Sequence, residues 1–299
     1  MKIRCKRIIA FLLLTVSLIL SLTGCVDQSQ GREAALQGQE RIVATSTSVV
    51  EICDKLDLDL IGVPTSSIYK LPERYEKVKK VGTPMSPDME VISTLGADWI
   101  IGPKSLQSDL QPKFKEGKSE YAFVNLDSIW GMYKSIQELG ELFGRAEQAD
   151  KLVNDFVTYY QSYQKKLKGK TRPSVLILMG LPGSYVVATE QSYVGSLVAM
   201  AGATNVCKEV SKDFVTINTE ELAKMNPDII LRASHAMPEQ VSAMFAEEFA
   251  TNDIWKHFRA VKEEKVYDLP GGQFGMSANF NYQDALETLQ KILYGEESA

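Results

Sequence analysis

Short apolar segments alternate with longer amphipathic segments along most of the chain, and this pattern constrains the fold more than any other feature. The short segments have the length of β-strands and cover residues 41–45, 59–65, 98–103, 121–125, 174–180, 185–189, 228–233 and 265–270. Such alternation is typical of parallel sheets whose strands are joined by crossover helices. Residues 129–168 interrupt the series with a long amphipathic pattern that has no internal proline, which predicts one or two extended helices. We therefore expect an α/β fold with two Rossmann-like lobes joined by a long helix, and a ligand cleft between the lobes.

An internal repeat supports two related lobes. Residues 90–101 align with residues 220–231 at a constant offset of 130. Each copy has a glutamate at an expected helix start, an apolar pair three residues apart, and an aspartate that precedes an apolar strand. Some helix–strand junctions share these features without being repeats, but twelve aligned positions favour two versions of one unit.

The first 25 residues have the pattern of a secretion signal. Four cations precede an apolar run from Ile8 to Leu22, and this run is shorter than the roughly 20 residues that a membrane-spanning helix needs. The following LTGC resembles the lipobox of bacterial lipoproteins, which implies cleavage before Cys25 and a lipid on that cysteine. An ordinary signal peptide or an uncleaved anchor is the alternative. Residues 25–40 are polar and aperiodic, so we interpret them as a tether.

Removal of the first 24 of 299 residues leaves 275, enough for two domains. We expect an N-terminal lobe at 41–140, a linking helix at 141–170 and a C-terminal lobe at 171–299. The net charge of −5 argues against a nucleic-acid partner. We also expect no long basic cluster in the mature region, which argues the same way. Cys53 and Cys207 show no metal-site spacing and are expected to be small buried apolar residues.

Histidine is scarce, since the chain has only two. His257 lies between Trp255 and Phe258, which are expected to pack on one face, so a structural role is favoured for this segment. His235 directly follows an expected strand, and open α/β sheets bind ligands at the carboxyl ends of their strands. By itself His235 is equally consistent with a ligand and with an ordinary polar loop residue.

The scarcity of histidine also restricts the metal chemistry. A bare zinc or manganese site usually gathers several His and carboxylate ligands, whereas haem iron needs only two axial ligands from the protein. Histidine and methionine form one such pair. Met85 lies in GTPMSPD between Pro84 and Pro87, and the two prolines restrict the backbone on either side. The alternative for Met85 is a side chain packed against the surface of its lobe.

A lipid-anchored chain with two α/β lobes joined by a long helix resembles the substrate-binding proteins of ABC importers. It resembles in particular the class of these binding proteins that has a rigid helical backbone. Residues 252–269 are similar to a signature of that class. The segments GTPMSPDMEVISTL, ILMGLPGSYVVAT, NPDIILRASHAMPEQVSAMF and NDIWKHFRAVK together resemble the haem-binding lipoprotein family of the iron-regulated surface determinant system. This resemblance implies haem b as the transported ligand, with Met85 and His235 as the axial ligands of its iron. Ala236 departs from the family, which can have glycine after the histidine.

The resemblance also implies contacts to the haem propionates and rim. The residues expected to supply them are Ser46, Thr47, Ser48, Tyr69, Lys70, Ser184 and Tyr185. Hydroxyls and backbone N–H groups at a helix start suit an anion, although Lys70 is equally consistent with a solvated surface charge. Phe274, Met276 and Phe280 are candidates for apolar cover of the porphyrin.

Glu90 and Glu220 occupy equivalent places in the repeat. Each alone is explained by favourable electrostatics at a helix N-terminus. As a pair they resemble the two glutamates with which this importer class docks onto a two-subunit permease.

The leading hypothesis is thus a monomeric receptor, anchored by lipid to the extracellular face of the membrane of a Gram-positive bacterium. It would receive haem from surface donor proteins and pass it to an ABC permease and its ATPase. An iron-siderophore or cobalamin carrier of the same fold is the alternative. An enzyme acting on haem is disfavoured, because six-coordinate iron has no open position and no nucleophile–His–acid set is apparent in the sequence.

Overall fold

The computed structural model describes residues 40–66, 70–208 and 211–295, and residues 42–299 form one compact unit. Cys25, the tether before residue 40, and Tyr69 lie outside the described residues. Within the described ranges no helix is both long enough and apolar enough to cross a membrane.

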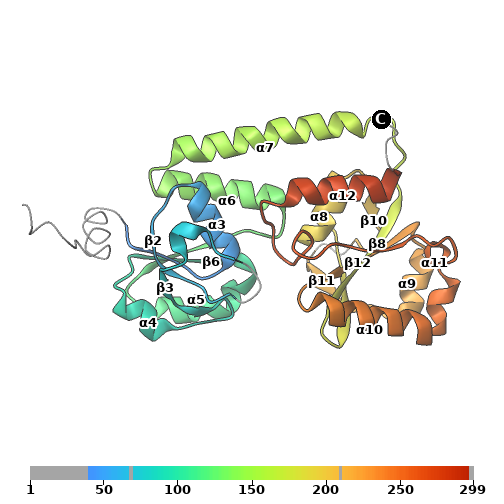
Figure 1. Ribbon diagram of the computed structural model, residues 1–299, viewed down its shortest axis with the longest axis horizontal. Coiled ribbons are helices and arrows are strands. Elements are labelled where there is room, and N and C mark those ends of the chain that lie inside the picture. The colour runs from blue at the N-terminus through green and yellow to red at the C-terminus, as the bar shows by residue number, and fades with distance from the viewer. Residues whose placement is uncertain (1–39, 67–69, 209–210, 296–299) are drawn as a thin grey trace, which may run out of the picture. The chain divides into compact units, whose positions relative to one another are not determined.

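The first sheet is entirely parallel and has the strand order β3-β2-β1-β6-β7 (Figure 1). Its strands are β1 (Ile42–Ala44), β2 (Leu60–Val63), β3 (Lys79–Lys80), β6 (Trp99–Pro103) and β7 (Glu120–Val124). The helices and 3-10 turns of this lobe are α3 (Thr47–Lys55), η1 (Glu73–Tyr75), α4 (Met89–Thr94), η2 (Lys104–Leu106) and α5 (Gln107–Lys115). The first lobe is therefore α/β, as the alternation predicts.

A short hairpin extends from the end of β3. Its strands β4 (Gly82–Thr83) and β5 (Ser86–Pro87) pair antiparallel, so Pro84 and Met85 form the two-residue loop. The backbone N–H of Thr65, beyond β2, donates to the carbonyl of Gly82 at 2.7 Å. This bond ties the base of the hairpin to the neighbouring strand.

The second sheet is mixed, which corrects the expectation of purely parallel strands. Its main path is β11-β9-β8-β12-β13, with β10 beside β8. The strands are β8 (Ser174–Leu181), β9 (Ser184–Ala188), β10 (Thr204–Asn205), β11 (Phe214–Val215), β12 (Ile229–Ser234) and β13 (Val266–Asp268). Strands β9 and β11 run antiparallel to their neighbours, whereas β10, β12 and β13 pair parallel.

The reason for the antiparallel pair is the loop between β8 and β9. Leu181 pairs with Ser184, so only Pro182 and Gly183 connect the strands. Such a connection joins antiparallel strands, whereas parallel neighbours need a crossover. Gly183 has φ of +79°, which suits glycine in a tight turn. The helices of this lobe are α8 (Tyr193–Met200), α9 (Thr219–Met225), α10 (Pro238–Thr251), η3 (Asp253–His257), α11 (Arg259–Lys262) and α12 (Tyr282–Tyr294).

Polar caps begin several of these helices. Ser46, Ser128 and Ser192 each accept a hydrogen bond from a backbone N–H three residues on, and for α3 the structure decides for Ser46 over Ser48. The structure confirms that Cys53 and Cys207 are buried. It also confirms that Trp255 and Phe258 pack together, with ring centroids 4.7 Å apart.

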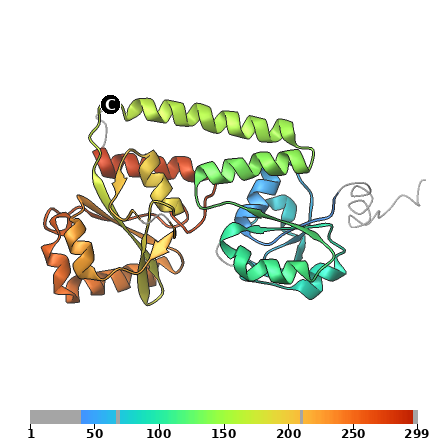
Figure 2. The same ribbon diagram turned by 180° about the vertical axis from the view of Figure 1, so that it is seen from behind.

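Residues 129–168 form two helices, α6 (Ile129–Leu142) and α7 (Ala146–Lys166), which lie side by side (Figure 1 and Figure 2). The break contains Gly144 with φ of +66°. Helix α7 buries Ala149, Phe156 and Tyr163, a stripe with seven-residue spacing. The Tyr163 hydroxyl donates to the carbonyl of Leu286 in α12 at 2.9 Å. Helix α7 therefore packs on both α6 and α12.

The repeat predicted at an offset of 130 is present in the structure. Helix α4 has the cap Asp88, and α9 has the cap Asn218 at the same offset. Each helix leads to an internal strand of its sheet, β6 from Trp99 and β12 from Ile229. The aspartates before these strands are Asp98 and Asp228.

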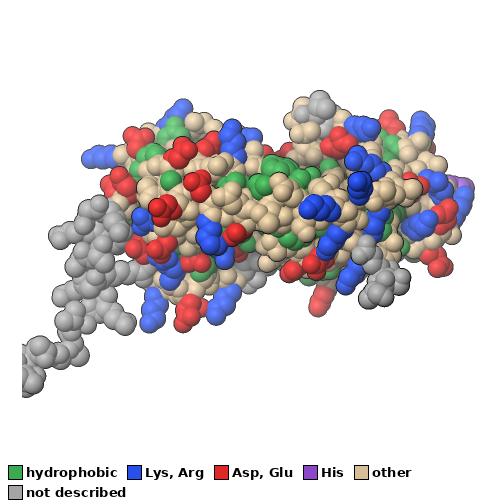
Figure 3. Space-filling view, turned by 90° about the horizontal axis from the view of Figure 1, so that it is seen from above, with side chains coloured by type: hydrophobic (Ala, Val, Ile, Leu, Met, Phe, Trp, Pro, Cys, Tyr) green, Lys and Arg blue, Asp and Glu red, His purple; other side chains and the backbone are tan. Residues whose placement is uncertain are grey.

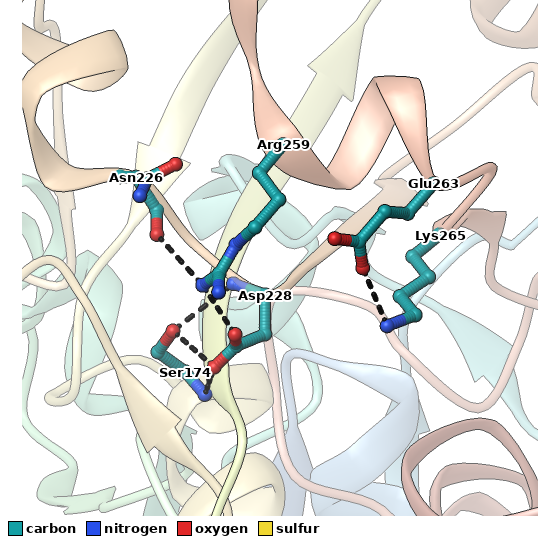
Figure 4. Close-up of polar contacts among 6 residues, drawn as sticks. All are labelled: Ser174, Asn226, Asp228, Arg259, Glu263 and Lys265. Carbon is teal, nitrogen blue, oxygen red and sulfur yellow. Dashed lines mark hydrogen bonds and ion pairs between the residues drawn. The ribbon is translucent and has the colours of Figure 1, made fainter.

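Asp228 organises the amino end of the second sheet (Figure 4). Its Oδ2 accepts from the backbone N–H of Ser174 at 2.8 Å and from the Ser174 hydroxyl at 2.7 Å. Arg259 forms an ion pair with the other carboxylate oxygen and also donates to the carbonyl of Asn226. The Ser174 bonds are the main cause that lowers the pKa of Asp228. This network joins β8, β12 and α11 at the edge away from the strands' carboxyl ends.

Candidate functional site

The carboxyl ends of the first sheet gather at one edge, because all five strands are parallel. Residues 46–48 follow β1, Thr65 follows β2 and the β4–β5 hairpin follows β3. In the second sheet the carboxyl ends of β8, β12 and β13 likewise lie together, since these strands are mutually parallel. The predicted ligand residues lie at these two edges.

Met85 is 75% exposed at the tip of the β4–β5 hairpin. It is one of the few large apolar side chains that the described surface leaves open. Pro84 precedes it in the loop and Pro87 lies in the hairpin strand, so the backbone that carries the sulfur is restricted on both sides. The side chain does not pack against the surface of its lobe, which removes the structural alternative for Met85.

His235 is the first residue after β12, as predicted. Its backbone N–H donates to the carbonyl of Gly180 in β8 at 3.1 Å, which fixes the start of the loop. The residue keeps much of its surface exposed, and partial burial of the imidazole by the surrounding protein lowers its pKa. The ring is therefore neutral at pH 7, which is the form that binds a metal. His257, by contrast, lies on η3 next to the buried Trp255.

Ser46, Thr47 and Ser48 lie at the N-terminal end of the nine-residue helix α3. Ser46 is buried and its Oγ accepts from the N–H of Val49 at 3.4 Å, so its oxygen serves the helix cap. Thr47 and Ser48 are half-buried in the first turn. Positive helix ends attract anions, so this turn remains suited to a carboxylate.

Lys70 forms an ion pair with Glu76 at 3.1 Å, and its side chain is 84% exposed. This favours the interpretation of Lys70 as a solvated charge over a propionate ligand. Both side chains line a hollow of about 240 Å³ beyond the end of β2, together with Thr65, Ser66, Leu71 and Lys80.

Ser184 and Tyr185 lie close to His235 in the second sheet, because Gly180 of β8 pairs with both Tyr185 and Ser234. Ser184 is exposed at the turn. The Tyr185 hydroxyl instead donates to Glu248 at 3.3 Å, and its ring packs beside Phe245 at 5.9 Å. Tyr185 therefore has structural partners of its own, and Ser184 is the more available of the two.

The candidates for porphyrin cover differ among themselves. Phe274 is buried in the core with 1% of its surface exposed, so it is not available to a ligand, contrary to expectation. Met276 and Phe280 are partly buried against that core. The Lys55 ammonium lies 5.8 Å from the centroid of the Phe280 ring.

Glu90 and Glu220 are both exposed in the first turns of their helices, α4 and α9. Their positions are equivalent in the two lobes, as the repeat predicts. Both sites are consistent with helix-terminus electrostatics.

Asp213, Asp127 and Lys104 form a charged group that no sequence motif predicts. Asp213, before β11, has a raised pKa, mainly from burial and then from the nearby carboxylate of Asp127, while Lys104 opposes the shift. Lys104 itself forms an ion pair with Asp127 at 3.5 Å. The three residues are far apart in the sequence, so no local motif signals them. No group of three or more His, Cys, Asp or Glu suited to a metal ion occurs in the described part of the chain.

Comparison with known proteins identifies the family to which this architecture belongs. The periplasmic binding protein family matches residues 42–271. "High-affinity heme uptake system protein IsdE" of Staphylococcus aureus strain bovine RF122 / ET3-1 is 42% identical over 293 residues, which cover 97% of this chain and 99% of the relative. The crystal structure of S. aureus IsdE complexed with heme superposes with a TM-score of 0.80 at 43% identity, over 86% of this chain and 99% of the other.

A second solved relative is an ABC transporter substrate-binding protein from Listeria monocytogenes EGD-e. Its TM-score is 0.81 at 47% identity, over 86% of this chain and 100% of the other. The chain belongs to the periplasmic binding protein family, and within it to the family of the staphylococcal IsdE proteins. The resemblance stated from the four sequence segments is thereby confirmed.

Proposed function

We propose that this protein binds haem and delivers it to an ABC permease, with Met85 and His235 as the axial ligands of the iron. The observation that carries the proposal is that each lobe exposes one side chain of a type that can bind iron at its sheet edge, Met85 on a restricted hairpin and His235 at a strand end. The relationship to IsdE, which was crystallised with heme, supports the choice of ligand.

The chemistry follows from the two donor atoms. The imidazole of His235 is neutral at pH 7 because partial burial lowers its pKa, so a ring nitrogen is free of its proton for the iron. The thioether of Met85 is a soft ligand that favours reduced iron and raises its potential. Haem supplies four equatorial nitrogens, and two protein ligands complete the six positions. Such iron has no open site for O₂, which suits transport.

The wider arrangement is part of the same proposal. Lobes at 41–140 and 171–299, linked by a helical segment at 141–170, enclose the haem, and helix α3 with Ser184 contacts its polar edge. Cys25 carries the lipid that holds the monomeric protein to the outer face of the cell membrane. Glu90 and Glu220, one on each lobe, dock on the permease, whose ATPase drives import of haem received from surface donors. The relatives' names support the transport role.

Haem titration followed by absorption spectroscopy tests the ligand assignment. Wild-type protein should give a sharp Soret band and, after reduction, resolved α and β bands. The variants Met85→Ala and His235→Ala should each change these bands, because one axial ligand is lost. An iron-siderophore or cobalamin carrier would give no haem spectrum at all.

Two matched controls exist in the chain. His257→Ala removes the only other histidine. Met237→Ala removes another exposed methionine, 53% exposed and two residues beyond His235. Both should leave the spectrum as in the wild type. If haem binds but neither Met85→Ala nor His235→Ala alters the bands, the axial assignment is wrong.

A further inference from the structure

The end of α7 and the loop after it form a basic surface. Five cations lie between residues 165 and 172, in the sequence KKLKGKTR. This run corrects the expectation that the mature chain holds no long basic cluster. It also contrasts with a chain whose net charge is −5.

Four of these cations, Lys165, Lys168, Lys170 and Arg172, line a hollow of about 450 Å³. Its walls are Gln161, Gln164, Lys165, Leu167, Lys168, Gly169, Lys170, Arg172, Gly202 and Tyr294. Lys and Arg side chains gather on the surface over the end of α7 (Figure 3). A hollow of this size lies within the range of small-ligand pockets.

The backbone bends the basic run around the hollow. The N–H of Lys168 donates to the carbonyl of Lys165 at 3.3 Å, and that of Lys170 to the carbonyl of Leu167 at 3.1 Å. Gly169 between them has φ of +83°, a conformation that glycine adopts readily. The turn therefore points successive cations toward one space instead of spreading them along an extended loop.

Residues from distant segments make a fixed floor. The Tyr294 hydroxyl donates to the carbonyl of Ala201 at 3.1 Å, and the Gln164 amide donates to the carbonyl of Met200 at 2.8 Å. Lys170 Nζ lies 5.0 Å from the centroid of the Tyr294 ring. The side chains at the floor are held by these bonds, whereas the exposed cations at the rim remain open to solvent.

Favourable helix electrostatics explain only part of the cluster. Lys165 and Lys166 lie in the last turn of α7, where a cation is stabilised by the helix dipole. Lys168 and Arg172 lie beyond the end of α7, so the helix dipole does not explain their positions. Within the described ranges, no ion pair joins Lys165, Lys168 or Arg172 to a carboxylate.

We propose that this hollow binds the phosphate group of an anionic lipid headgroup. Phosphate oxygens match a cluster of Lys and Arg donors, and such clusters attract anionic membrane surfaces by about 1 kcal/mol for each cation. Leu167 and the Tyr294 ring add apolar surface beside the charges. This step rests on the proposed function: a lipid at Cys25 would keep the protein close to such headgroups, so weak binding would suffice.

Vesicle flotation tests the site. The experiment uses residues 40–299, which lack Cys25, so that binding cannot come from the lipid anchor; this range includes the compact unit of residues 42–299. The protein should float with vesicles of phosphatidylcholine and phosphatidylglycerol in a 3:1 ratio, and not with phosphatidylcholine alone. The triple variant Lys165→Gln, Lys168→Gln, Arg172→Gln should lose about a hundredfold in affinity for the mixed vesicles.

The matched control removes the same charge elsewhere. Lys113, Lys115 and Lys118 are exposed at the end of α5, and their triple Gln variant should bind mixed vesicles like the wild type. Equal losses in both triple variants would show general electrostatics and overturn the site. A far-UV circular dichroism spectrum and a thermal unfolding midpoint like those of the wild type establish that both variants fold.

A second arm separates lipid from free phosphate. Inorganic phosphate at 10 mM, with ionic strength held constant by sodium chloride, should leave vesicle binding unchanged. If the protein does not float with the mixed vesicles but binds inorganic phosphate in their absence, the hollow is a site for the free anion and the lipid assignment is wrong. Failure of the haem proposal would not affect either arm, because neither Met85 nor His235 takes part.

Discussion

The two lobes share one structural unit but present their candidate iron ligands in different ways. At the offset of 130 that relates α4 to α9, the position equivalent to Met85 is Val215 in β11, and the position equivalent to His235 is Ser105 in η2. The first lobe carries its sulfur on a hairpin that follows an edge strand, whereas the second carries its nitrogen directly at the end of an internal strand. The repeat therefore supplies the scaffold, and each lobe adds its functional residue independently.

The largest effect should come from the aromatic packing between α6, α7 and α12. Phe156 is 1% exposed, and its ring centroid lies 4.3 Å from that of Tyr133 and 5.8 Å from that of Tyr282. Phe156→Ala should lower the free energy of unfolding by about 3–5 kcal/mol, because it opens a cavity in the core. Urea denaturation measures this loss.

Phe114→Ala is the comparison variant, since Phe114 is equally buried but packs only within the first lobe. It should cost similar stability yet leave haem affinity nearly unchanged, whereas Phe156→Ala should weaken haem binding as well. Unchanged haem affinity in Phe156→Ala would show that the helical connection does not set the relation of the lobes.

The two candidate iron ligands should differ according to the oxidation state of the iron. The thioether of Met85 favours the reduced metal, whereas an imidazole binds both states. Met85→Ala should therefore weaken binding of reduced haem more than of oxidised haem, by about tenfold or more, or about 1.4 kcal/mol. His235→Ala should weaken both. Titrations under dithionite and in air measure the two affinities, and identical losses in both states for Met85→Ala would contradict sulfur ligation.

Haem affinity should depend on pH through His235. Its pKa is lowered by partial burial, below the ordinary value of about 6.5, and the iron competes with the proton for the ring. Affinity should be constant above that range and fall by about tenfold per pH unit once the imidazole protonates. Equilibrium titrations between pH 5 and 8 measure this; His257→Ala should keep the profile, and His235→Ala should flatten it.

The Asp228 network should contribute to stability only in the second lobe. Its hydrogen bonds with Ser174 keep the pKa of Asp228 below the usual range, so the stabilisation is present above about pH 4 and is lost as the pH falls through the lowered value. Asp228→Asn should cost about 1 kcal/mol at pH 7 and less at pH 3. Urea denaturation at both pH values measures this loss, with Asp150→Asn at an exposed position of α7 as the control. A loss of unfolding free energy that is not smaller at pH 3 would contradict this role.

The smallest effect should come from Asp213. Burial and the charge of Asp127 raise its pKa, so the ionised carboxylate opposes the folded state at neutral pH and this cost disappears as Asp213 protonates. Asp213→Asn should raise the thermal unfolding midpoint slightly at pH 7. Asp109→Asn, at an unrelated exposed position, should leave the midpoint unchanged. A lower midpoint in Asp213→Asn would contradict a destabilising effect of the Asp213 charge.

Much of the fold follows from local signals. Ser46 and Ser48 before an amphipathic run predict that a helix starts there, and α3 begins after Ser46. The two copies of the repeat, residues 90–101 and 220–231, predict equivalent helix–strand units, as observed. The apolar composition of β8 and β9 does not indicate that β9 runs antiparallel. The direction of β9 is determined by the short Pro182–Gly183 turn between the two strands.

The site was predictable only in part. Scarcity of histidine draws attention to His235, and two prolines draw attention to Met85, because both signals lie within a few residues of the side chain concerned. Phe274 has the same apolar character as a porphyrin-contacting residue but is buried, since composition does not say which side of the core a ring faces.

The sequence by itself determined the α/β alternation, the helix caps, the repeat and the identity of the two candidate ligands, because each depends on residues close together in the chain. Only the tertiary structure decided that Met85 is exposed, that Asp213 lies near the charge of Asp127, and that four cations line a hollow floored by Gly202 and Tyr294. Those features depend on segments brought together by packing of the sheets and of α7, and burial and long-range charge are set by the folded neighbours.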